Sequence, residues 1–205
     1  MKKVLTTTWY LEMREQPEKM SKLFLPENFT LVKWDKPTVE EYLQIYRAVG
    51  GKYNWYDRLL MDRAKLEAIL GSAETEVMLL IFDTKRDDNS APSDASVPGL
   101  PGSAVKPIGG LTENDEIAIA GFSELSHATA GETEIVYFGL CDDFTGRKVG
   151  MPFLSSVIHY AWNRARKINR LWLHTCDLDH PAALPLYKKA GFLEYDRQSV
   201  LQNVK

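Results

Sequence analysis

The sequence has 205 residues, of which 44% are hydrophobic and 26% are charged, and its formal net charge at pH 7 is −3. This size and composition are typical of one globular domain with a sizeable core, so we expect residues 1–205 to form a single domain. The charge balance gives no electrostatic reason to expect nucleic acid or an anionic membrane as a partner. No apolar run approaches the roughly 20 residues that would cross a bilayer.

Two features predict a cytoplasmic protein. The segment 1–8 contains two lysines but no apolar stretch behind them, which argues against a signal peptide. Cys141 and Cys176 lack the spacing of metal or redox motifs, and we expect free thiols, as in a reducing compartment.

The residues before position 84 predict two helices and two strands. Apolar residues recur at helical spacing in two segments, which end at Gly50-Gly51 and at Gly71. The short apolar run at 76–82 is typical of a buried strand, and residues 30–33 leave room for a first strand before the helices. The expected elements are helices over 36–49 and about 56–70, and strands at 30–33 and 76–82.

Residues 84–110 differ in kind from the rest of the chain. They are rich in Asp, Ser, Pro and Gly and contain no aromatic residue and no periodic pattern. Such a composition is typical of a disordered segment, and strand patterns occur on both sides of it. We therefore expect a flexible insertion within the domain, and we favour a mobile surface loop over a specific docking element.

Strands and helices alternate after this insertion. The expected strands are 116–125, 134–140, 170–175 and 192–195, and the expected helices are 150–167 and 181–190. The first two strands are close enough in sequence to pair as an antiparallel hairpin. The strand–helix–strand order that follows predicts a crossover with two parallel strands, which is almost always right-handed. The fold class is therefore α/β with a mixed sheet.

The loop of residues 142–152 lies between a strand and the clearest helix. Gly146 and Gly150 let the backbone turn tightly and expose its N–H groups. The following helix adds unsatisfied N–H donors and the positive end of its dipole, and Arg147 and Lys148 add positive charge. This combination predicts a pyrophosphate site, with an ordinary strand-to-helix turn as the alternative.

A second motif follows at residues 180–192, which read H-P-A-A-L-P-L-Y-K-K-A-G-F. It is similar to the motif N-x-x-A-x-x-L-Y-x-x-x-G-F of the GNAT N-acetyltransferase superfamily, with His180 in the position of Asn. The preceding loop resembles the acetyl-CoA loop of that superfamily, Q/R-x-x-G-x-G/A. There, Thr145 replaces Gln or Arg and Lys148 replaces the central Gly. The resemblance covers roughly residues 116–197.

The resemblance implies a GNAT fold, in which helices cover both faces of a mixed central sheet and two parallel strands splay apart around acetyl-CoA. It implies transfer of the acetyl group from this co-substrate to an amine by direct attack, without a covalent enzyme intermediate. Gly139 suits a β-bulge that starts the splay, or alternatively a close approach of a helix. The residues implied to bind acetyl-CoA are Phe138, Gly139, Leu140, Gly146, Arg147, Lys148, Val149, Gly150, Met151, His180 and Ala183.

The same resemblance implies that Tyr187 protonates the departing thiolate, with a packed core tyrosine as the alternative. A general base must also accept a proton from the amine. Glu134 is the first candidate, directly or through water, and Glu124 is the second; ordinary strand carboxylates are the alternative for both. The weaker candidates are His127 in a turn, His159 on a helix face and His174, which we expect to be a satisfied, half-buried strand residue.

Trp55, Tyr56 and Arg58 lie between the first two helices, where they either border the acceptor cleft or belong to the core. No set of histidine, cysteine and carboxylate residues has metal-ligand spacing, so we expect no metal. The loop of residues 142–152, which we call the phosphate loop, departs from the superfamily motif at two positions. A non-catalytic acyl-CoA-binding regulatory module of the same fold therefore remains the functional alternative. A longer acyl group and a homodimer also stay open, and the acceptor amine is undetermined.

Overall fold

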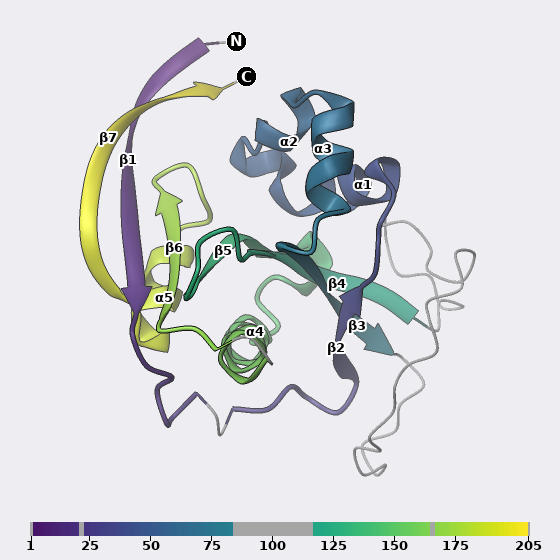
Figure 1. Cartoon of the computed structure of the whole chain (residues 1–205), viewed down its shortest axis with the longest axis vertical. Coiled ribbons are helices and arrows are strands. Elements are labelled where there is room, and N and C mark those ends of the chain that lie inside the picture. The colour runs from purple at the N-terminus through teal and green to yellow at the C-terminus, as the bar shows by residue number, and fades with distance from the viewer. Residues whose placement is uncertain (1, 21–22, 84–116, 165–166, 205) are drawn as a thin grey trace.

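The structure, a computed structural model, describes residues 2–20, 23–83, 117–164 and 167–204 (Figure 1). The insertion expected over 84–110 lies outside the described residues, as does residue 116 at the start of an expected strand.

One seven-stranded sheet runs through the described part of the chain. Its strands are β1 (Lys2–Met13), β2 (Phe29–Trp34), β3 (Thr75–Asp83), β4 (Ile117–Ser126), β5 (Glu132–Leu140), β6 (Arg170–Cys176) and β7 (Leu193–Val204). Their order is β2-β3-β4-β5-β6-β1-β7. The β5–β6 pair is parallel and the other neighbours are antiparallel, which confirms the mixed sheet, the β4–β5 hairpin and the parallel crossover.

Helices cover both faces of this sheet, as predicted (Figure 1). One side carries α1 (Val39–Gly50), α2 (Asp57–Leu60) and α3 (Arg63–Leu70), and the other carries α4 (Gly150–Asn163) and α5 (Ala183–Ala190). We call these sides the α1 face and the α4 face. Consecutive residues of β5 point to opposite faces: Tyr137 packs on Tyr46 of α1, with ring centroids 4.9 Å apart, and Phe138 packs on Phe153 of α4 at 4.6 Å.

The N-terminal helices begin at side chains that cap the backbone. Thr38 and Glu41 form a capping box at the start of α1, with the Thr38 N–H donating to the Glu41 carboxylate at 2.9 Å. The single helix expected over about 56–70 is instead two helices, α2 and α3. The reason is local: the Asp62 carboxylate accepts the N–H of Lys65 at 3.1 Å and so starts a new helix.

The two C-terminal helices are shorter than expected. The α4 helix ends at Asn163 rather than at 167, and α5 begins at Ala183 rather than at 181. Pro185 consequently lies in the first turn of α5, where no intrahelical acceptor exists for its missing N–H. Leu186 makes the first helical bond, to the Ala182 carbonyl at 2.9 Å, so Pro185 removes no hydrogen bond from the helix.

The β1 strand is the element that the sequence prediction missed. It lies between β6 and β7, and Tyr10 is opposite both His174 of β6 and Asp196 of β7. Its run Thr6–Thr8 obscures any apolar alternation, and both partner strands are far along the chain. The β7 strand, expected to end near Tyr195, continues to Val204 because β1 offers a partner along its length.

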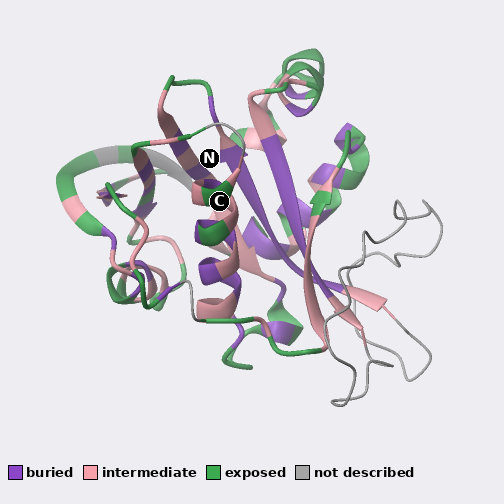
Figure 2. Cartoon of the chain, turned by 60° about the horizontal axis from the view of Figure 1, so that its bottom comes forward, coloured by how far each residue is buried: buried purple, intermediate pink, exposed green. Residues whose placement is uncertain are grey.

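Buried residues run along the central strands and along the sides of the helices that face them (Figure 2). The largest fully covered side chains come from both faces and include Leu11, Tyr42, Tyr46, Phe122, Phe153, Leu154 and Phe192. Among the described residues, no helix is long and apolar enough to cross a bilayer. In the described part of the chain, neither Cys141 nor Cys176 forms a disulfide bond.

Candidate active site

The parallel strands β5 and β6 part near the middle of the sheet. Their ladder pairs run from Glu132 with Arg170 to Ile135 with Leu173, whereas β5 continues to Leu140 and β6 to Cys176. The splay that we expected between two parallel strands is therefore present in the structure.

The β-bulge lies at Val136 rather than at Gly139. In the β4–β5 ladder, Glu124 is opposite Tyr137 and the next residue of β4 is opposite Ile135, so Val136 is the extra residue. It comes directly after the last residue of β5 that pairs with β6. Because an extra residue bends its strand, the bulge gives β5 a local reason to turn away from β6.

Gly139 instead lets α1 approach the sheet. A Cβ atom at this position would lie 2.4 Å from Cγ1 of Val49 and 3.6 Å from Cη2 of Trp55. Real side chains do not tolerate the first distance, so a glycine is required for close helix packing. The bulge that we had assigned to Gly139 was wrong, and the alternative of close helix packing is correct.

The loop between β5 and α4 has the geometry of an anion-binding turn. Gly146 and Lys148 both have positive φ, at 82° and 62°, and residues 145–148 are exposed. Val149, which precedes α4, makes no side-chain cap, so the first N–H groups of the helix have no side-chain acceptor. Arg147 lies beside them, with its guanidinium 5.0 Å from the centre of the Phe144 ring.

A second turn, between β6 and α5, carries two further predicted residues. His180 is exposed, and its Nδ1 accepts the Ala182 N–H at 3.0 Å, which is a role an Asn side chain also performs. Its ring lies 5.8 Å from that of Tyr53 in η1 (Gly51–Tyr53). Ala183 is the first residue of α5, directly after this turn.

Tyr187 lies on the α4 face, next to the parting strands. Its side chain is 7% exposed and packs on Phe138 of β5 and on Phe192, with ring centroids 6.2 Å away in each case. Burial raises the pKa of its hydroxyl well above the usual value, and the charge of Asp179 acts in the same direction. The hydroxyl is therefore protonated at neutral pH.

Glu134 lies on the α1 face and contacts a histidine. Its Oε1 is 3.3 Å from Nδ1 of His174 on β6, and the two side chains are 21% and 44% exposed, respectively. The Tyr10 ring of β1 lies 5.9 Å from the imidazole. Sequence reasoning did not pair these two residues, because the pairing depends on the parallel register of β5 and β6.

Glu124, the second candidate base, is enclosed in the core. It is 1% exposed, accepts a hydrogen bond from the Tyr42 hydroxyl and forms an ion pair with Arg58. The Arg58 guanidinium also lies 5.2 Å from the centre of the Tyr137 ring. Arg58 therefore neutralises a buried carboxylate, which supports the core alternative for this residue.

Trp55 connects the two sides of the parting strands. Its indole Nε1 donates to Oδ1 of Asp179 in the turn after β6, at 3.0 Å. The other oxygen of Asp179 accepts from the Thr175 hydroxyl at 2.6 Å and from the Cys176 N–H at 3.0 Å. Sequence reasoning missed Asp179; its only signal was its position four residues after Thr175, just before the second motif.

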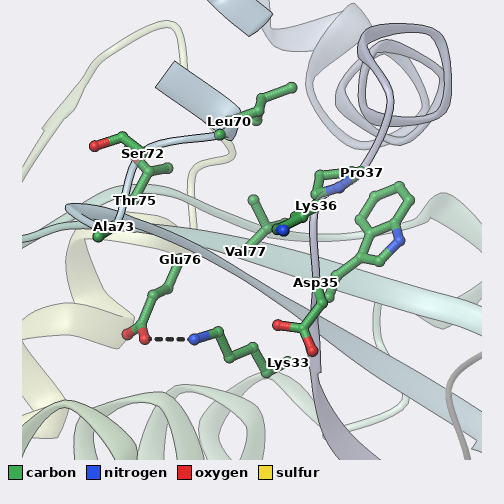
Figure 3. A pocket seen from close by; sticks show the side chains of 12 residues that line it. Lys33, Asp35, Lys36, Pro37, Leu70, Ser72, Ala73, Thr75, Glu76 and Val77 are labelled. Carbon is green, nitrogen blue, oxygen red and sulfur yellow. Dashed lines mark hydrogen bonds and ion pairs between the residues drawn. The ribbon is translucent and has the colours of Figure 1, made fainter. Parts of the chain in front are cut away.

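His127 belongs to a separate buried cluster. It is 1% exposed, and its two ring nitrogens contact Thr133 and Glu76, each at 2.9 Å. Glu76 also accepts from Lys33 at 2.9 Å, at the edge of a pocket of about 250 Å³ between β2 and the turn from α3 to β3 (Figure 3). None of the predicted site residues lines this pocket.

In the described parts of the chain, no group of histidine, cysteine and acidic residues could hold a metal ion. His159 is exposed and contacts Gln16, with Nε2 of Gln16 3.3 Å from Nδ1 of the histidine. The contact between His159 and Gln16 lies outside the region where β5 and β6 part.

Comparison with known proteins identifies the fold. Residues 96–192 match the model of the acetyltransferase (GNAT) family. This match confirms the predicted resemblance to the GNAT superfamily, and the solved structures described next confirm the GNAT fold.

Solved structures of GNAT proteins are similar over almost the whole chain. A tandem GNAT protein from the clavulanic acid biosynthesis pathway has a TM-score of 0.58 at 11% identity, over 96% of this chain and 53% of that one. A GCN5-related N-acetyltransferase from Kribbella flavida has a TM-score of 0.52 at 13% identity, over 97% of this chain and 59% of that one. Another, from Sphaerobacter thermophilus, has a TM-score of 0.50 at 17% identity, over 96% of this chain and 50% of that one.

At these identities the structural likeness shows the fold alone. The chain spans little more than half the length of these GNAT proteins. No curated protein sequence matches the chain.

Proposed function

We propose that the chain transfers an acetyl group from acetyl-CoA to an amine of a small molecule or peptide, by direct attack. The observation that supports this most is the parting of β5 and β6 after Ile135 and Leu173. The gap joins a cationic turn at the N-terminus of α4 to a polar region of the α1 face. A thioester in the gap would meet an amine from the α1 face.

Acetyl-CoA, as co-substrate, fits the turn before α4. Gly146 and Lys148 have positive φ, and the start of α4 has no side-chain cap. The turn and the helix start can therefore direct several N–H groups at one pyrophosphate. The pantetheine arm would follow the unpaired part of β5. The residues proposed to bind acetyl-CoA are Phe138, Gly139, Leu140, Gly146, Arg147, Lys148, Val149, Gly150, Met151, His180 and Ala183.

Two residues supply the proposed proton transfers. Tyr187 protonates the thiolate as the carbon–sulfur bond breaks, because its buried hydroxyl keeps its proton at neutral pH. Glu134 is the carboxylate on the opposite face that draws the proton from the attacking amine. The two groups lie on different faces of the sheet, so neither competes for the proton of the other.

The departures in the phosphate loop are compatible with binding. Lys148, at the position of the central glycine, adopts φ 62° and so keeps the left-handed turn that glycine would give. The loop backbone is therefore retained despite the substitution, which supports co-substrate binding in a transferase and in an acyl-CoA-binding regulatory module alike.

We also propose that residues 1–205 act as one domain, because β1 and β7 come from the two ends of the chain and are adjacent in one sheet. The two cysteines form no disulfide bond in the described part of the chain, which is compatible with a cytoplasmic location, and we propose that location as well.

The test is release of free CoA from acetyl-CoA in the presence of a panel of amines and amino acids. We expect release with some acceptors and a matching acetylated product. Tight acetyl-CoA binding without turnover of any acceptor would favour the regulatory module. Absence of binding would contradict both functions.

A further inference from the structure

The imidazole of His174 lies where the two parallel strands part. Leu173 is the last residue of β6 that pairs with β5, and His174 follows it directly. Leu173 is buried, whereas the side chain of His174 is 44% exposed. Asp57 of α2 acts electrostatically on the imidazole, which indicates that His174 faces the α1 side of the sheet.

The contact with Glu134 engages only one of the two ring nitrogens. The Oε1 atom of Glu134 is 3.3 Å from Nδ1, which leaves Nε2 as the nitrogen for a bound molecule. Glu134 is the less exposed of the two side chains. A molecule that approaches from the α1 face therefore meets the imidazole before the carboxylate.

His127 shows what a purely structural histidine looks like in the same sheet. It is buried, and Thr133 and Glu76 occupy both of its ring nitrogens. His174 differs on both counts, because it is exposed and one nitrogen has no such partner. This contrast argues against our expectation that His174 is a satisfied strand residue.

We infer that His174 accepts the proton of the acceptor amine through Nε2, and that Glu134 is a positioning residue that holds the ring through Nδ1. The inference rests on the proposed function and refines it, because it replaces direct proton transfer to Glu134. Glu134 fixes the tautomer and stabilises the imidazolium that forms, as carboxylates do beside other general-base histidines.

The proton balance of the step is complete. The acceptor arrives as an ammonium ion and first releases one proton to solvent. The neutral amine nitrogen then forms a bond to the carbonyl carbon of the thioester, and one N–H proton passes to Nε2 of His174. The carbon–sulfur bond then breaks, and the thiolate takes a proton from Tyr187. The proton on His174 leaves through solvent and Tyr187 is reprotonated, so the products are the acetylated amine and free CoA.

The groups around His174 make its surroundings acidic. They come from every element that contacts or faces it: Glu134 of β5, Tyr10 of β1, Asp57 of α2 and Asp179 of the turn after β6. The hydrogen bond with Glu134 raises the pKa of His174, against the opposing effect of burial. Carboxylates at this position also favour an acceptor that arrives as a cation, which an amine at neutral pH is.

The test compares His174→Gln and Glu134→Gln with His159→Gln, a matched change at an exposed histidine of α4. The readouts are kcat/KM against pH, acetyl-CoA affinity and the NMR titration of the imidazoles. We expect His174→Gln to lower kcat/KM by about 10²–10⁴-fold, to remove the acidic limb of the profile and to leave acetyl-CoA affinity within about twofold. His159→Gln should change none of these.

Glu134→Gln should retain the acidic limb but move it to lower pH, together with the NMR titration of His174, because the carboxylate no longer stabilises the imidazolium. The inference would be overturned if His174→Gln kept the limb, or if Glu134→Gln removed it while His174→Gln did not. A wild-type protein that turned over no acceptor would overturn the proposed function and this inference together.

Discussion

At the scale of single residues, Tyr187 combines burial with contact to β5 at the parting strands. Changing Tyr187 to Phe removes one hydroxyl and little volume, so packing on Phe138 and Phe192 should persist. We expect kcat to fall by about 10²–10⁴-fold, because the thiolate loses its proton donor, while acetyl-CoA binding changes little. Steady-state kinetics and calorimetry measure both effects.

Tyr160→Phe on α4 is the control for this change, since Tyr160 lies near Glu76 and outside the proposed site. It should leave kcat unchanged. If Tyr187→Phe retained kcat within about twofold of the wild type, water or the amine would have to supply the proton, and Tyr187 would be a core residue.

The backbone conformation of Lys148 lowers the stability of the fold, whereas its charge favours acetyl-CoA binding. An L-residue with φ 62° is strained by roughly 1–2 kcal/mol, and glycine relieves this strain while adding freedom to the unfolded chain. Lys148→Gly should therefore raise the free energy of unfolding by about 0.5–1 kcal/mol. It should also weaken acetyl-CoA binding several-fold, because the positive charge is lost.

Lys36→Gly is a matched control, because exposed Lys36 also has positive φ, at 49°, and lies outside the phosphate turn. Urea unfolding should show a similar gain for both variants. Only Lys148→Gly should alter acetyl-CoA affinity; an equal loss in both would show that the charge of Lys148 has no specific role.

At the scale of the element, the start of α4 determines where the pyrophosphate would bind. Gly150 is its first residue, and a Cβ atom there would meet only Leu140, at 3.8 Å. A carboxylate in the first turn suits the helix dipole, so Gly150→Glu should fold. It should lower acetyl-CoA affinity at least tenfold, about 1.4 kcal/mol, by placing negative charge beside the phosphates.

Asn163→Glu adds the same charge at the other end of α4 and should not change acetyl-CoA affinity. Isothermal titration calorimetry on both folded variants separates the two cases. Unchanged binding in Gly150→Glu would mean that the pyrophosphate lies elsewhere.

At the scale of the whole molecule, the Glu76 cluster links β2, β3, the β4–β5 turn and α4. Burial disfavours the ionised form of Glu76, but hydrogen bonds from His127 and Lys33 outweigh it and lower its pKa to about 2, from 4.5. A lowered folded-state pKa stabilises the protein above about pH 4.5, and this contribution is lost as the pH falls toward 2. It amounts to about 2–3 kcal/mol.

Glu76→Gln should therefore reduce the free energy of unfolding at neutral pH, and the difference from the wild type should shrink in acid. Urea unfolding at several pH values measures this. Glu40→Gln, which removes an exposed partner of Arg63, should have little effect at any pH. A Glu76→Gln deficit that stayed constant with pH would show that ionisation is not its cause.

Much of the fold follows from local sequence patterns. The end of α1 at Gly50, the helix α4 and the order strand–helix–strand are properties of neighbouring residues, and all three are confirmed. The break between α2 and α3 was missed, although Asp62 was a local signal for it. The two motifs were sufficient to predict the family before any geometry was known.

The sequence by itself determined the element types, the turn before α4 and the second motif, because backbone conformation and capping depend on residues a few positions apart. Only the tertiary structure decided the position of β1 between β6 and β7, the packing role of Gly139 and the contact of Glu134 with His174. Each of these joins segments far apart along the chain. Strand register and helix approach arise from burial of the whole sheet, which no local pattern encodes.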